Sequence, residues 1–133
     1  MKLDRAALLA GIVTAVIISV PAALIGQAID DPSTSDNPSA AALILVAVVL
    51  VGLGAGATVA AVRQEVGAPL VHGIVTALVT FVLVQGIGVI RHLIANEDVL
   101  WSRVLSSALL SMVAGTIGGL IGARLKHETE PAG

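Results

Sequence analysis

The chain has 133 residues, of which 56% are hydrophobic and only 12% are charged, and its mean hydropathy is +1.01. A soluble domain carries about a quarter charged residues, so this composition excludes a soluble globular protein and favours an integral membrane protein. The formal net charge of −2 excludes a strong attraction to nucleic acid, and the absence of cysteine excludes disulfides and thiolate metal sites.

Four long segments without charged residues separate the charged clusters of the chain. Each approaches or exceeds the roughly 20 residues that a helix needs to cross the hydrocarbon core of a bilayer. Ser39 is a suitable N-cap for the second segment, and Pro69 suits the first turn of the third. The sequence therefore predicts an all-α membrane protein with one domain over residues 1–133. Its four transmembrane helices are expected at about residues 6–28, 40–62, 69–90 and 100–123, with a connection at 92–98 and a polar, frayed tail at 126–133.

Lysine and arginine are distributed unequally between the two ends of these helices. Positive residues are enriched in cytoplasmic segments of membrane proteins. One end would carry five of them and the other end only Arg91 and Arg103. We therefore expect both termini to lie in the cytoplasm, together with Lys2, Arg5, Arg63, Arg124 and Lys126.

The pentapeptide GIVTA occurs twice, at residues 11–15 and again at 73–77. A shift of 62 residues aligns the first segment with the third, and a shift of 61 aligns the second with the fourth, placing Gly54 against Gly115. This pattern predicts a duplicated two-helix hairpin, about residues 6–62 and 69–124, whose two copies run parallel to each other. Because the first segment aligns with an internal helix, we expect it to be retained rather than cleaved as a signal peptide.

Small residues recur at every fourth position in the predicted helices. Helices in a bilayer gain little from hydrophobic burial against each other, so small residues that permit close backbone approach are favoured where they meet. These residues are therefore expected to pack the helices within the chain, although a conduction path or an oligomer interface is also compatible with them. In the third segment, Phe81 and Gln85 replace the small residues that Ser19 and Ala23 provide in the first.

Few polar residues fall inside the predicted helices. Gln85 is expected either to line a polar path or to bond a neighbouring helix, and His72 is expected to be a structural, neutral histidine near a helix N-terminus. Hydroxyls such as that of Thr14 are expected to bond carbonyls of their own helix, with no base beside a serine to activate it. We therefore expect no enzyme activity, catalytic residue, cofactor or metal site. The candidate functional residues are His72, Gln85, Arg63 and Phe81.

Two glycine patterns resemble those of a known family. The first is Gly54-x-Gly56-x3-Ala60-x2-Arg63-x3-Gly67-x4-His72-Gly73, and the second is Ala114-Gly115-x2-Gly118-Gly119-x2-Gly122. Together they resemble the YrzE-like family of small four-helix bacterial membrane proteins, which has no assigned catalytic residue. The resemblance implies a bacterial plasma-membrane protein in which the cytoplasmic turn at 63–73 is a recurring feature.

These observations favour a non-enzymatic helical bundle that acts by association with itself or with another membrane protein in the lipid bilayer. The alternative is a small channel or transporter with a path between the two hairpins, lined by Gln85, Thr14 and Thr76.

Overall fold

The computed structural model describes residues 2–29, 39–96, 98–99 and 101–129. They form the helices α1 (Arg5–Ile29), α2 (Ala40–Arg63), α3 (Pro69–Ile94) and α4 (Trp101–Thr129). All four are long and apolar enough to cross a membrane. The prediction of an all-α protein with four candidate membrane-spanning helices is confirmed.

The helix starts follow the local sequence signals. The Ser39 hydroxyl accepts the N–H of Ala42 at 3.1 Å and so caps α2, as predicted. Pro69 occupies the first turn of α3, where a missing N–H leaves no hydrogen bond unmade.

Two helix ends were predicted too early. Helix α3 continues to Ile94 and includes part of the expected connection at 92–98, and α4 continues to Thr129 into the expected frayed tail. Charged residues end an apolar segment without ending a helix, and cations in a last turn interact favourably with its carbonyl groups. Arg91 and Lys126 occupy such last turns, so they follow the end of the apolar segment rather than the end of the helix.

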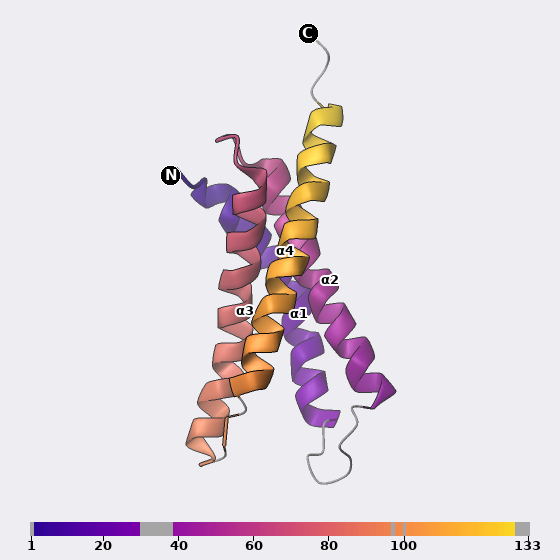
Figure 1. Ribbon diagram of the computed structural model, residues 1–133, viewed down its shortest axis with the longest axis vertical. Helices are drawn as coiled ribbons and strands as arrows, with labels where there is room; N and C mark the ends of the chain where they lie inside the picture. The colour runs from indigo at the N-terminus through magenta and orange to yellow at the C-terminus, as the bar shows by residue number, and fades with distance from the viewer. Residues whose placement is uncertain (1, 30–38, 97, 100, 130–133) are drawn as a thin grey trace.

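The helices form two hairpins, α1–α2 and α3–α4 (Figure 1). The start of α1 and the end of α4 lie at the same end of the molecule, which we call the termini end. Helices α2 and α3 contact each other and both remaining helices, whereas α1 and α4 make no contact with each other within the described residues. The hairpins converge toward the termini end and separate toward the opposite, far end (Figure 1).

Glycines bring the two helices of each hairpin into backbone contact. A methyl group added at Gly11 of α1 would lie 2.6 Å from the carbonyl oxygen of Gly56 and 2.7 Å from the Cβ of Ala60. A methyl group added at Gly73 of α3 would lie 2.7 Å from the carbonyl oxygen of Gly115 and 2.8 Å from a backbone atom of Gly119. The first helix of each hairpin therefore meets the second through the same kind of contact.

The two hairpins are joined by a further set of close contacts between α2 and α4. A methyl group at Gly118 would meet Gly54 and lie 2.8 Å from the Cβ of Ala57, and one at Gly122 would lie 2.6 Å from the Cβ of Ala61. The Thr58 hydroxyl donates to the carbonyl oxygens of both Gly54 (2.9 Å) and Gly118 (3.1 Å). These contacts confirm that small-residue stripes pack helices within the chain.

Candidate functional site

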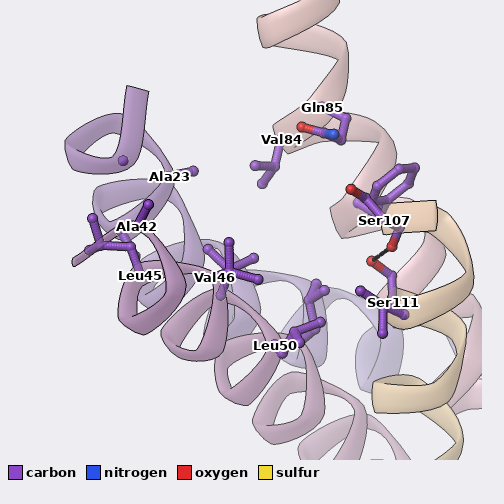
Figure 2. Close-up of a pocket in the computed structure, with 15 residues that line it drawn as sticks. Ala23, Ala42, Leu45, Val46, Leu50, Val84, Gln85, Ser107 and Ser111 are labelled. Carbon is purple, nitrogen blue, oxygen red and sulfur yellow. Dashed lines mark hydrogen bonds between the residues drawn. The ribbon is translucent and has the colours of Figure 1, made fainter. Parts of the chain in front are cut away.

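A cavity of about 260 Å³ lies between the two hairpins, in the half of the molecule nearer the far end (Figure 2). All four helices line it, and we call it the interhairpin cavity. Helix α1 contributes small residues such as Ala23, and α2 contributes an aliphatic wall that includes Leu45, Val46 and Leu50. Most of its lining is therefore apolar, as in sites that accept apolar ligands.

Two of the predicted candidate residues, Gln85 and Phe81, meet at this cavity. The side chain of Gln85 extends from α3 toward the α1–α2 hairpin (Figure 2). Its amide makes no hydrogen bond to the described part of the chain, so the expected bond to a neighbouring helix is not formed there. An amide without a partner is costly in an apolar environment, and Gln85 therefore presents free donors and an acceptor to whatever occupies the cavity.

Two serines of α4, Ser107 and Ser111, add hydroxyl groups to the same cavity. Their hydroxyls donate to the carbonyl oxygens of Arg103 and Ser107, each at 2.8 Å, which confirms the predicted bonds within the helix. Each hydroxyl oxygen can still accept a hydrogen bond. The sequence did not assign these serines to a site, although their four-residue spacing places both on one face of α4.

The position of Gln85 along α3 places the cavity within the membrane span. Gln85 precedes Ile90, the last residue of the predicted apolar segment at 69–90, by five positions, and at about 1.5 Å per residue this is roughly 7 Å of helix. The hydrogen-bonding groups of the cavity are thus one to three turns below the far end of the helices rather than at their ends.

His72 lies in a second polar cluster, at the termini end. Its side chain is completely buried. The Nδ1 atom is 2.8 Å from the carbonyl oxygen of Ala68, and Nε2 is 2.9 Å from the backbone nitrogen of Asp4. Because a carbonyl can only accept and a backbone N–H can only donate, Nδ1 carries the proton and Nε2 accepts. His72 is therefore a neutral histidine that attaches the start of the chain to α3.

Asp4 caps α1 within the same cluster. Its carboxylate accepts the N–H groups of Ala6 at 3.0 Å and Ala7 at 3.1 Å. The Ala7 N–H is the main cause of a pKa below the usual value for this carboxyl group. The N–H groups of Ala6 and Glu65 lower the pKa further, as does the positive charge of His72 when its ring is protonated, while partial desolvation opposes them. Because the pKa of Asp4 is lowered on folding, the stabilisation that its ionised carboxylate provides is complete above the usual aspartate pKa. This stabilisation is lost as the pH falls through the lowered pKa.

Gln64 and Lys126 complete this cluster, which we call the polar cluster (Asp4, Gln64, Ala68, His72 and Lys126). The buried Gln64 side chain accepts the N–H of Ala68 at 3.1 Å, and the Lys126 ammonium donates to the Gln64 carbonyl oxygen. The start of α1, the α2–α3 turn and the end of α4 are thereby joined. The roles of Gln64, Asp4 and Lys126 are not evident from the sequence, because they depend on contacts across 62 or more residues or on burial within a turn.

Arg63, the remaining predicted candidate, ends α2 with an exposed side chain. It flanks the polar cluster, whereas Gln85 and Phe81 lie at the interhairpin cavity. The four candidate residues thus belong to different regions of the molecule rather than to one site. Within the described ranges, no three histidine, aspartate or glutamate side chains gather as metal ligands.

Replacing the buried Gln64 with leucine is expected to lower the stability of the protein by about 1–3 kcal/mol, because the half-buried N–H of Ala68 loses its acceptor. Gln64→Glu keeps an acceptor oxygen and serves as the matched variant. Thermal unfolding in detergent would measure both. Equal melting temperatures for wild type and Gln64→Leu would show that the side-chain bond is not needed.

Threonine hydroxyls inside the bundle differ in their bonding. Thr14 donates to the carbonyl oxygen of Ala10 at 2.9 Å, as predicted. Thr76 and Thr80 are completely buried, and their hydroxyls have no hydrogen-bond partner among the described residues. They follow His72 at four-residue intervals and therefore form a buried polar stripe on one face of α3.

No protein-family profile matches the chain, and no curated protein or solved structure gives a significant match.

Proposed function

We propose that the chain is a non-enzymatic integral membrane protein that acts by holding an apolar segment of another membrane molecule in the interhairpin cavity. The single observation that supports this proposal is the cavity itself: an apolar space at membrane depth that contains the unpartnered amide of Gln85. A transmembrane segment of another protein, or of a second copy, supplies the apolar surface and the backbone or side-chain groups that such an amide can bond.

The glycine contacts also indicate which surface of the protein is available for association with a partner. Gly11, Gly56, Gly73, Gly115 and Gly118 all face other helices of the same chain. Their stripes are used in packing the bundle, so association is assigned to the cavity rather than to an outward-facing glycine stripe.

The topology we propose has both termini in the cytoplasm and a duplicated parallel hairpin. The five-to-two distribution of positive residues supports the orientation. The contact of Gly11 with Gly56 in the first hairpin matches that of Gly73 with Gly115 in the second, and this match supports the duplication. Residence in a bacterial plasma membrane is proposed from the resemblance to the YrzE-like family.

Site-specific photo-crosslinking from α2 tests the proposed association. Val46 and Val51 are exposed valines on the same helix, but Val46 lines the cavity whereas Val51 does not. A benzophenone amino acid at position 46 is expected to give a protein adduct of discrete mass that Gln85→Leu weakens several-fold, and the same group at position 51 is expected to give diffuse lipid labelling. Lipid adducts alone at both positions would contradict association with a protein.

A channel or transporter is the second candidate function, and Gln85, Ser107 and Ser111 are the observation that favours it, because three polar side chains share one space between the hairpins. Liposome flux assays with ions and small polar solutes distinguish the two functions. Transport that Gln85→Leu abolishes would support a transport path through the cavity. The absence of transport in liposomes that contain the folded protein would support the binding function.

A further inference from the structure

We propose that His72 makes the termini end of the bundle sensitive to pH: protonation of its ring releases the start of the chain from α3. This inference is independent of the proposed binding function, because it concerns the opposite end of the molecule. It rests on the two hydrogen bonds of a completely buried imidazole.

The two bonds require opposite roles from the ring nitrogens. Nδ1 donates to the Ala68 carbonyl oxygen, and Nε2 accepts the Asp4 N–H. An imidazolium ring has a proton on both nitrogens and no acceptor. Protonation therefore keeps the Ala68 bond, but it replaces the Asp4 bond with two N–H groups that face each other.

The Asp4 bond matters because Asp4 precedes the first residue of α1. The Asp4 carbonyl oxygen accepts the N–H of Leu8 at 3.0 Å, and its carboxylate caps the helix. Loss of the bond to His72 thus leaves α1 capped but detaches its start from α3. The expected change is a movement of residues 2–4, together with the first turn of α1, away from the α2–α3 turn.

Other charged groups meet at this end and bear on the same equilibrium. The Asp4 carboxylate interacts electrostatically with His72. The Lys126 ammonium is attached to the Gln64 carbonyl oxygen of the turn. The charged and titratable residues of the elements that converge here are Lys2, Asp4 and Arg5 before and in α1, Arg63 and Glu65 at the α2–α3 turn, and Arg124, Lys126, His127 and Glu128 in α4.

The natural chain contains no cysteine, so a distance across this contact can be measured with two introduced cysteines. Leu3 and Val66 are exposed and lie on the two sides of the contact, in the N-terminal segment and in the α2–α3 turn. Spin labels on Leu3→Cys and Val66→Cys would report the separation in nanodiscs between about pH 8 and about pH 5, the range in which histidine titrates. The ratio of attached to detached populations is expected to fall about tenfold on acidification, the size of effect that one hydrogen bond has on an equilibrium.

Matched variants assign the change to the proposed group. His72→Gln keeps a donor and an acceptor but does not titrate, so its distance distribution is expected to stay that of the attached form at both pH values. His92→Gln with His127→Gln removes the other two histidines and is expected to leave the response intact. Asp4→Asn keeps the backbone N–H that bonds Nε2 and removes the titratable carboxylate, so the response is expected to persist in this variant.

Two results would overturn the proposal. One is a distance distribution of the natural His72 protein that does not change with pH, and the other is a change of the same size in His72→Gln. Nitrogen chemical shifts of the His72 ring provide a measurement on the unsubstituted protein. A proton on Nδ1 alone at about pH 8 is required, and a proton on Nε2 would contradict the hydrogen bonds on which the proposal depends.

Discussion

Gly56→Ala is expected to destabilise the bundle by about 1–3 kcal/mol, the usual cost of adding a methyl group to a well-packed contact. The added methyl group would meet the Gly11 carbonyl oxygen and lie 2.6 Å from the Cβ of Ala15. Both neighbours are close to rigid helix backbone, so relief requires α1 and α2 to separate. Equilibrium unfolding in mixed micelles, followed by circular dichroism, measures the effect.

Gly86→Ala is the matched control for this prediction. Gly86 also lies within a helix, but a methyl group there would find no atom of another helix within 4 Å. Alanine has a higher helix propensity than glycine by up to about 1 kcal/mol, so this variant is expected to be neutral or slightly more stable. Equal losses in Gly56→Ala and Gly86→Ala would show that the close contact of α1 and α2 does not hold the bundle together.

Leu53→Ala is expected to cost about 2 kcal/mol. Leu53 is only 1% exposed and is one of the residues that line the interhairpin cavity. In soluble proteins such a change costs about 2–5 kcal/mol, part of it for transfer of leucine out of water. In a membrane, the separated helices keep leucine in lipid, so no transfer from water is involved. The cost of the substitution then comes mainly from lost packing contacts, and we expect it at the lower end of the range of about 2–5 kcal/mol.

Leu9→Ala provides the comparison for Leu53→Ala. Leu9 is 62% exposed on the outside of α1, so alanine there removes lipid contacts in both the folded and the separated state. The unfolding free energy of Leu9→Ala is expected to match that of the natural protein. A loss as large as that of Leu53→Ala would mean that the outer face of α1 is itself covered in the assembly.

The sequence predicted the helices and their packing residues well because both depend on local composition. Long apolar segments must be helical in a bilayer, and Ser39 and Pro69 mark helix starts by their own chemistry. The helix ends at Ile94 and Thr129 were harder to predict. Charged residues indicate where the apolar segment stops, but the backbone hydrogen bonds of the helix continue beyond that point.

The alignment of the two hairpins illustrates what sequence identity misses. A shift of 61 residues pairs Gly54 with Gly115, but the contacts make Gly56 the equivalent of Gly115, 59 residues away. Gly56 meets Gly11 and Ala15 of α1 as Gly115 meets Gly73 and Ala77 of α3. In glycine-rich helices several registers give similar identities, and only the partner helix distinguishes them.

The candidate residues show a similar division. Polarity alone identified Gln85 and His72, since both are unusual in apolar helices. Their surroundings depend on segments distant in sequence: the cavity requires all four helices, and the acceptor role of His72 requires a backbone N–H 68 residues away. Such contacts leave no pattern in a single sequence.

Native mass spectrometry of protein released directly from membranes is the most direct test that the interhairpin cavity holds another membrane molecule. Ala23→Phe fills the cavity that Ala23 lines, whereas Ala28→Phe adds the same ring at an exposed position of α1. The natural protein and Ala28→Phe are predicted to carry a bound partner that Ala23→Phe has lost. A partner retained equally by all three proteins, or found with none of them, would contradict this account.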